Sequence, residues 1–506
     1  MRTSGILLPI SSLPSKYGIG CFSKEAYQFV DFLSKAKQTY WQLLPIGPTS
    51  YGDSPYQSFS TYAGNPYFID LEELIAQGLL TAEECDAVDF GDDEEMVDYE
   101  KIYLGRFTLL RKAYERSNVE QNAKYADFCE EQSYWLYDYA SYMAIKMHFG
   151  GKSFMEWPDD IRLRKEDVLK AYCEKLQDEI KFYQYIQFEF YCQWNRLKTY
   201  ANEKGIYIIG DIPIYVAPDS ADVWANPELF QMVDGKPNAV AGCPPDGFSP
   251  TGQLWGNPLY DWTYHKKTDF AWWVGRIRHC TKLYDVIRID HFRGFDQYYS
   301  IPANEDTAVN GQWEDGPGIA LFETIQKELG EIKIIAEDLG FITDTVRKLV
   351  SDTGFPNMKV LQFAFDSRDS GDSSEYLPFN YPRNCVVYTG THDNETLYGW
   401  LEDIEESEIE YISEYLGIEN KSKESICRGL IRSAHNSVAS YCIIPLQDYL
   451  LLDNSARMNT PSTTGGNWQW RFKADVVTEE LAEEIANLTC LYGRSKIGRS
   501  KDGHDN

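Results

Sequence analysis

The stretch YDVIRIDHFRGF, residues Tyr284–Phe295, joins an apolar run to charged residues on one face. In an extended strand, alternation places Arg288 and Asp290 on the same side as Val286. A parallel strand that is buried on both faces is typically a nearly continuous run of Val and Ile, so two charges are unexpected here. Burying a charge is unfavourable unless the charge is paired. The two residues therefore form either a structural ion pair or part of a functional site.

Seven further runs of this kind recur along the chain, and amphipathic stretches such as Ser23–Ala36 and Gly318–Gly330 separate most of them. Strands that alternate with helices predict a parallel sheet, and about eight such units is typical of a (β/α)8 TIM barrel. A doubly wound open sheet is the alternative, although it usually has fewer strands. The predicted strands are Gly5–Ile10, Tyr40–Ile46, Ile206–Ile214, Tyr284–Asp290, Lys333–Leu339, Met358–Phe365, Cys385–Asp393 and Tyr441–Asp448.

Two segments are too long to be simple barrel connections. Residues 71–204 are charged and have helical periodicity, which predicts a helical subdomain inserted between the second and third strands. Residues 216–273 are rich in Pro, Gly, Trp and Asn, which predicts an irregular, loop-rich insertion of functional importance. We expect residues 1–494 to form a single catalytic barrel domain that carries both insertions, followed by a loose tail at 495–506.

Composition excludes several classes of partner. The 506 residues are 43% hydrophobic and 25% charged, as in an ordinary water-soluble protein, and their net charge of −30 disfavours nucleic acid and anionic membrane surfaces. We find no signal peptide and no run of about eighteen apolar residues that could span a membrane. The 11 cysteines are scattered without a CxxC pair, which predicts reduced thiols in a cytoplasmic protein and makes a zinc site improbable.

Acidic residues recur where the predicted strands end. Active sites of such barrels lie at the carboxyl ends of the strands, so these side chains are expected to converge on one rim. Because Glu337 and Asp338 are adjacent, alternation allows only one of them to face the interior. The other residues expected at this rim are Asp211, Arg288, Asp290, His291, His392 and Asp393.

Paired carboxylates of this kind suit a retaining reaction at a glycosidic bond, in which one is the nucleophile and the other the acid and then the base. Arg288 is placed to lower the pKa of Asp290, and an apolar environment would raise that of Glu337. Loop tyrosines and tryptophans offer flat faces for sugar rings. A metal-dependent hydrolase could use similar residues, but Arg288 beside Asp290 would repel a cation. The chain has no GxxxxGK[ST], HExxH or GxSxG motif.

Nearly the whole chain, from SGILLPISSLPSKYGIG to about Arg494, resembles the 4-α-glucanotransferases (amylomaltase or disproportionating enzyme) of the α-amylase superfamily. Seven motifs in order carry the resemblance, and together they are highly specific. They are YGDSPYQSFSTYAGNPYFIDL, GDIPIYV, GCPPDGFSPTGQLWGNPLYDW, RIDHFRGF, AEDLG, GTHDNET and RMNTPSTTGGNWQWR. One departure is Gly247, where many relatives are expected to carry a side chain.

The resemblance implies a barrel with insertions and no C-terminal β-sandwich, and it implies roles for particular residues. Asp290 looks like the nucleophile, Glu337 like the general acid/base, and Asp393 like a third carboxylate that holds the hydroxyls of the distorted sugar. Arg288, His291, His392 and Asp211 resemble the residues around that sugar. The remaining residues that resemble substrate contacts are Ser54, Tyr56, Asp246, Gln253, Trp255, Asn459 and, at a secondary glucan groove, Tyr51.

The sequence thus predicts transfer of a segment of an α-1,4-glucan or maltooligosaccharide to the 4-hydroxyl of another glucan or glucose. The reaction would need no cofactor and no metal, and the enzyme would be a cytoplasmic monomer or homodimer. An α-amylase-like hydrolase, in which water replaces the acceptor, shares the same first step and is the alternative. A non-catalytic glucan-binding protein would be expected to lack a catalytic carboxylate, and Asp290, Glu337 and Asp393 are all present.

Overall fold

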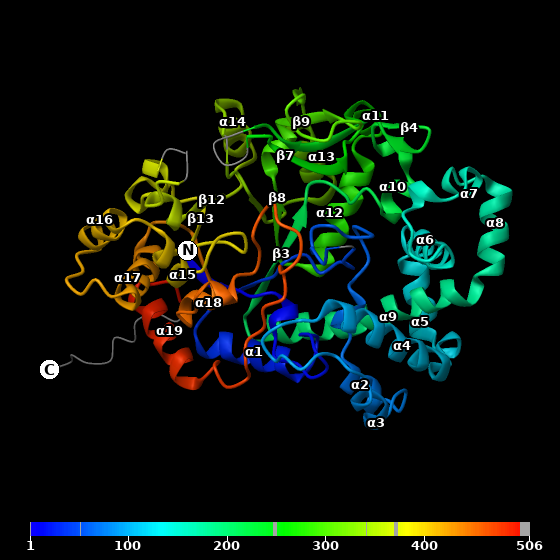
Figure 1. The fold of residues 1–506 in the computed structure, drawn as a ribbon, viewed down its shortest axis with the longest axis horizontal. Helices are drawn as coiled ribbons and strands as arrows, with labels where there is room; N and C mark the ends of the chain where they lie inside the picture. The colour runs from blue at the N-terminus through cyan, green and yellow to red at the C-terminus, as the bar shows by residue number, and fades with distance from the viewer. Residues whose placement is uncertain (1, 51, 246–249, 341, 369–372, 496–506) are drawn as a thin grey trace.

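The centre of the structure is a closed barrel of eight parallel strands (Figure 1). This computed structural model describes residues 2–50, 52–245, 250–340, 342–368 and 373–495. The predicted (β/α)8 barrel is confirmed. In order around the barrel, the strands are β1 (Thr3–Leu7), β14 (Tyr441–Pro445), β13 (Cys385–Tyr388), β12 (Asn357–Val360), β11 (Ile334–Ala336), β8 (Val286–Asp290), β3 (Tyr207–Pro213) and β2 (Tyr40–Gln42).

Most of these strands end earlier than the apolar runs predict. β2 stops at Gln42, and Pro45, which lacks an amide proton for a sheet ladder, follows three residues later. After β12, Leu361–Ala364 form a 3-10 helix rather than a continuation of the strand. The sequence did not reveal this because a short strand and a short buried helical turn look alike in sequence. As a result Glu337 and Asp393 lie beyond their strands, on the connecting segments.

Helices between the strands cover the outside of the barrel. α1 (Lys24–Lys35) and α13 (Ile319–Leu329) match two of the predicted amphipathic stretches, and α1 begins after Ser23. The other helices that follow barrel strands include α12 (Ala271–Leu283), α14 (Asp344–Thr353), α15 (Leu397–Asp403), α16 (Glu406–Leu416), α17 (Lys423–Asn436), α18 (Leu446–Tyr449) and α19 (Glu479–Leu491).

The described residues of the connection from β2 to β3 form eight α-helices, which lie on the opposite side of the barrel from α16 and α17 (Figure 1). Within it, the Gln187 side chain bonds both the N–H and the C=O of Gly64, and the Tyr191 hydroxyl donates to the carbonyl of Tyr62. The helices therefore hold the segment that follows β2. They are α2 (Leu71–Ala76), α3 (Ala82–Asp86), α4 (Tyr99–Ser117), α5 (Ala123–Glu131), α6 (Leu136–His148), α7 (Asp159–Arg162), α8 (Glu166–Lys175) and α9 (Gln177–Glu203).

The segment predicted to be irregular, 216–273, contains strands as well as loops. β6 (Ala239–Cys243) and β7 (Gln253–Pro258) join β9 (Gln297–Pro302) and β10 (Gln312–Asp315) in an antiparallel sheet of order β10-β9-β6-β7. The register shifts between Val240 and Gly242, which breaks the alternation that would reveal a strand in sequence. The segment also holds α10 (Ala221–Ala225), α11 (Trp262–Lys267) and the hairpin β4 (Met232–Val233) and β5 (Lys236–Pro237).

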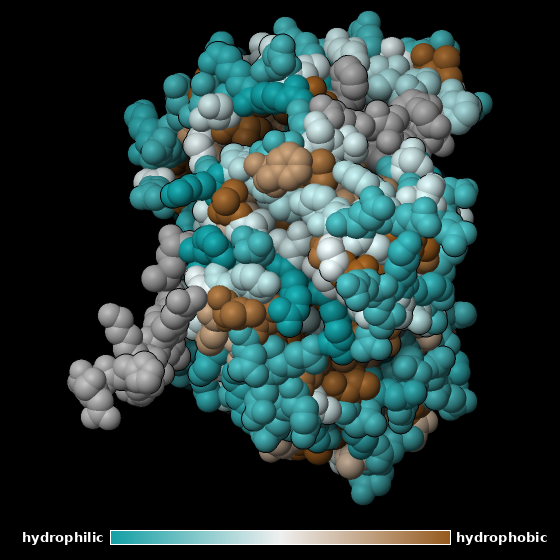
Figure 2. Space-filling view, turned by 90° about the vertical axis from the view of Figure 1, so that its left-hand side faces the viewer, coloured by the Kyte–Doolittle hydropathy of each residue, from teal (hydrophilic) through white to brown (hydrophobic). Residues whose placement is uncertain are grey.

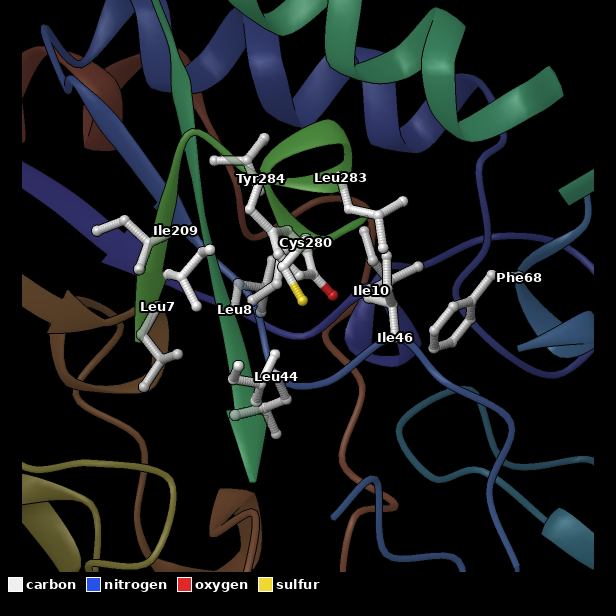
Figure 3. Packing of buried hydrophobic residues seen from close by; sticks show 14 of the residues in the cluster. Leu7, Leu8, Ile10, Leu44, Ile46, Phe68, Ile209, Cys280, Leu283 and Tyr284 are labelled. Atoms are coloured by element: carbon white, nitrogen blue, oxygen red, sulfur yellow. The ribbon is translucent and has the colours of Figure 1, made fainter. Parts of the chain in front are cut away.

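Apolar side chains from distant parts of the chain meet around the barrel (Figure 3). Gly210 of β3 lets the Tyr284 ring lie directly on the strand, because a Cβ atom at this position would come within 2.2 Å of that ring. Side chains on the face shown in Figure 2 are mostly hydrophilic, with hydrophobic groups in small separate clusters. No helix in the described part of the chain is long and apolar enough to cross a bilayer.

Candidate active site

Asp290, the last residue of β8, lies in an ion-pair network with Arg288 and Asp211. Arg288 donates from Nη1 to Oδ2 of Asp211 at 2.6 Å, and its Nη2 lies 3.1 Å from Oδ1 of Asp290. The pairing of β3 with β8 places Asp211 opposite Arg288 and thereby fixes this geometry. Asp211 is fully buried, whereas 30% of the Asp290 side chain remains exposed. Asp290 is therefore the accessible end of a buried charge network.

Glu337 lies beside Asp290 because strands β11 and β8 are paired. Ala336, which precedes Glu337, pairs with Ile289, which precedes Asp290. Its Oε2 accepts from the amide of His291 at 2.7 Å, and its Oε1 accepts from the amide of Leu339 at 2.7 Å. The left-handed backbone of His291, with φ of 53°, ends the strand directly after Asp290. Asp338 instead accepts from the amide of Met358 at 2.9 Å, so Glu337 is the member of the adjacent pair that reaches the site.

The environment separates the pKa values of the two carboxyl groups. Burial, together with the neighbouring charge of Asp290, raises the pKa of Glu337 to about 8, although Arg288 and two main-chain amides oppose the shift. Burial also raises the pKa of Asp290, to about 6, because the favourable charge of Arg288 only partly offsets the loss of water. Arg288 lowers this pKa, as predicted, but burial outweighs it and the net shift is upward. Near pH 7, Asp290 is ionised while Glu337 keeps its proton, as a nucleophile and an acid require.

Asp393 lies on the segment between β13 and α15, where several groups hold it as a carboxylate. Burial raises its pKa, but His392 and Asn459 outweigh burial and bring the value down to about 2. His392 Nε2 lies 3.2 Å from Oδ2, and Asn459 Nδ2 donates to Oδ1 at 2.6 Å. Arg457 donates to the main-chain carbonyl of Asp393 at 2.8 Å. The side chain is nevertheless 43% exposed, so an anionic oxygen is available to a ligand.

Tyr56 connects these two halves of the site. Its hydroxyl donates to Oδ2 of Asp211 at 2.8 Å, and its ring stacks on His392 with centroids 5.1 Å apart and an angle of 18°. Ser54 begins the turn that orients Tyr56, since its Oγ accepts from the amide of Tyr56 at 3.3 Å. The ring of Trp468 lies 5.9 Å from both Tyr56 and His392. Tyr56 is thus positioned by both the Asp211 and the Asp393 sides.

On the side of the β6–β7 strands, Trp255 meets His291 edge to face with ring centroids 4.8 Å apart. Gln253 accepts from the indole N–H of Trp255 at 3.0 Å and so orients that ring. Burial lowers the pKa of His291 to about 3, which keeps its imidazole neutral near pH 7. This wall therefore presents an aromatic edge and a neutral hydrogen-bonding ring beside Asp290.

Two of the predicted substrate contacts, Tyr51 and Asp246, lie outside the described residues, as does Gly247. The structure adds Trp468 and Arg457, which lie in the motif RMNTPSTTGGNWQWR but are not among the predicted site residues. Their partners are remote in sequence, so only the fold reveals which members of the motif reach the site. The sequence does offer one indication of them: an arginine and a tryptophan in a Pro- and Gly-rich loop, the kind of segment that often carries binding residues.

A barrel whose strand ends bring together an ionised aspartate, a protonated glutamate and a third, strongly acidic carboxyl group belongs to the enzymes that act on glycosidic bonds through carboxylates. A family model described as 4-alpha-glucanotransferase matches residues 8–477. The chain belongs to this family, glycoside hydrolase family 77.

Relatives and solved structures agree with this assignment. A 4-alpha-glucanotransferase of Clostridium butyricum is 51% identical over 96% of this chain and 99% of its own length. One of Streptococcus pneumoniae (strain TIGR4) is 51% identical over 97% of each chain. The amylomaltase of Streptococcus agalactiae in complex with acarbose superposes with a TM-score of 0.94 at 44% identity, covering 98% of this chain and all of that one.

Proposed function

We propose that this protein is a 4-α-glucanotransferase that acts on α-1,4-glucans and maltooligosaccharides by a retaining double displacement. The observation that carries the proposal is the adjacent pair Asp290 and Glu337, whose environments favour an ionised and a protonated carboxyl group at the same pH. We further propose one catalytic domain, residues 1–494, in a cytoplasmic monomer or homodimer.

In the first step, the carboxylate of Asp290 attacks the anomeric carbon of the donor while Glu337 gives its proton to the departing glycosidic oxygen. The bond to the leaving glucan breaks, and an ester bond to Asp290 forms. In the second step, the 4-hydroxyl of an acceptor loses its proton to Glu337 and attacks the same carbon, which releases Asp290. Two inversions at one carbon retain its configuration.

The pairing of the two carboxyl groups adjusts Glu337 for both steps. The negative charge of Asp290 raises the pKa of Glu337, which favours the protonated acid before the reaction. When Asp290 becomes an ester, this charge disappears and the pKa of Glu337 falls. Glu337 is then a carboxylate that can act as the base toward the acceptor hydroxyl.

The remaining residues are proposed to bind or position the sugar. Asp393, held as an anion, accepts hydrogen bonds from sugar hydroxyls, and these bonds strengthen as the ring distorts in the transition state. Arg288 and Asp211 are buried and act through Asp290 and Tyr56 rather than by direct contact. The substrate contacts are proposed to come from Ser54, Tyr56, His291, His392, Gln253, Trp255 and Asn459, with Tyr51 and Asp246 as further candidates.

Incubation of the purified protein with maltotriose alone tests the proposal. Transfer yields glucose together with a series of maltooligosaccharides longer than three units, which chromatography resolves by length. Release of only glucose and maltose would identify water as the acceptor and would replace transfer by hydrolysis. Asp290→Asn is the matched negative control, because it keeps the shape of the side chain and removes the nucleophilic charge.

A further inference from the structure

Asp448 is a buried carboxyl group that the mechanism leaves without a role. The eighth predicted strand ends on it in the sequence, and in the structure it lies in α18, directly after β14. It is 2% exposed, and burying a carboxylate is unfavourable unless hydrogen bonds compensate. Its hydrogen-bond partners therefore indicate which part of the structure it stabilises.

Its two oxygens hold the two ends of one connection. Oδ2 accepts from the hydroxyl of Thr389 at 2.5 Å, and Oδ1 accepts from the amide of Leu397 at 2.8 Å. Thr389 is the first residue after β13, and Leu397 is the first residue of α15. The segment between them, residues 390–396, contains His392 and Asp393.

Two further residues that follow β14 bond the middle of the same segment, residues 390–396. Arg457 donates to the carbonyl of Asp393 at 2.8 Å, and Asn459 bonds the Asp393 carboxylate. Residues that follow β14 thus hold the connection that follows β13 at several points. Asp448 bonds the two ends of that connection, and Asn459 bonds Asp393 in its middle. Burial raises the pKa of Asp448 to about 6, so near pH 7 it is mostly the anion that accepts both bonds.

We propose that Asp448 is a positioning residue for transglycosylation, which closes the 389–397 connection and thereby sets Asp393 and His392 against the sugar. This rests on the proposed function, in which Asp393 acts in the transition state. Displacing such a group by about 1 Å is enough to slow an enzyme by about a hundredfold. Because that interaction strengthens only in the transition state, its loss lowers kcat more than it changes KM.

Two substitutions at Asp448 separate polarity from packing. Asp448→Ala removes both hydrogen bonds, and we expect kcat for maltotriose disproportionation to fall about 10- to 100-fold with KM within about threefold. Asp448→Asn can keep both contacts, since its oxygen accepts from the Leu397 amide and its NH2 group donates to the Thr389 hydroxyl. We therefore expect kcat of this variant to stay within about threefold of the wild type.

Asp285 provides a matched control at the opposite end of the barrel. It precedes β8, and its Oδ2 also accepts one main-chain amide and one side-chain donor, from Ile208 at 2.8 Å and Asn202 at 2.9 Å. Asp285→Ala should lower the melting temperature and leave kcat per folded molecule unchanged. A loss of kcat as large as that of Asp448→Ala would overturn the proposal, and so would an unchanged kcat in Asp448→Ala.

Hydrogen–deuterium exchange gives a readout that does not depend on activity. Peptides covering residues 389–397 should exchange faster in Asp448→Ala than in the wild type, and at the wild-type rate in Asp285→Ala. Unchanged exchange in Asp448→Ala would contradict the positioning role even if transfer were confirmed. Wild-type protein that fails to lengthen maltotriose would contradict the proposed function instead, while the exchange comparison would still decide how the connection is held.

Discussion

The split pKa values of Asp290 and Glu337 predict a bell-shaped pH dependence of kcat/KM in the free enzyme. The reactive form requires ionised Asp290 and protonated Glu337, so activity rises through the lower pKa and falls through the higher one. The two apparent pKa values of the profile belong to the pair of carboxyl groups rather than to single residues, because each charge influences the other. With values of about 6 and about 8, the optimum lies near pH 7.

The size of the effect follows from the same two values. The reactive fraction is about 0.8 at pH 7 and about 0.1 at both pH 5 and pH 9, so kcat/KM should fall about ninefold in each direction. The signs follow from the proposed chemistry: at low pH Asp290, the proposed nucleophile, is protonated, and at high pH Glu337, the proposed acid, has lost its proton.

Initial rates at low maltotriose concentration, stopped at fixed times and analysed by chromatography, measure this profile without a pH-sensitive coupling enzyme. Circular dichroism at each pH serves as the control that the protein remains folded. A profile that stays flat between pH 5 and pH 9, or one with a single limb near pH 4, would refute the assignment of the two roles. Such a result would mean that burial does not separate the two carboxyl groups as the geometry indicates.

Three further outcomes are expected. Asp290→Asn should lower transfer by at least about 10⁴-fold at an unchanged melting temperature, and activity within about tenfold of the wild type would exclude it as nucleophile. Asn459→Ala removes a hydrogen bond to the Asp393 carboxylate, so kcat should fall about 10- to 100-fold; a change only in KM would contradict a transition-state role. Lys146→Met removes the buried ammonium partner of Asp219, whose own side chain is 17% exposed, and should destabilise the fold by about 3 kcal/mol in urea titration. An unchanged midpoint would show that the pair contributes little.

The sequence revealed the barrel because a parallel sheet buries its strands on both faces. Runs such as Cys385–Tyr388 and Tyr441–Pro445 are therefore apolar and stand out from the helices around them. It also revealed which strand ends carry carboxyl groups. It failed at the antiparallel strands β6 and β7, because the register shifts between Val240 and Gly242 and the short strands show no clear alternation.

By itself, then, the sequence determined which segments along the chain form the barrel strands, which carboxyl groups lie at the ends of those strands, and which motifs the chain shares with the family. Only the tertiary structure decided that Glu337 rather than Asp338 meets Asp290, and that burial outweighs Arg288 in setting the pKa of Asp290. It alone also placed Asp448 under the connection that carries Asp393. The physical reason is that hydrogen bonds and loss of water depend on neighbours in space, and these neighbours come from strands far apart along the chain.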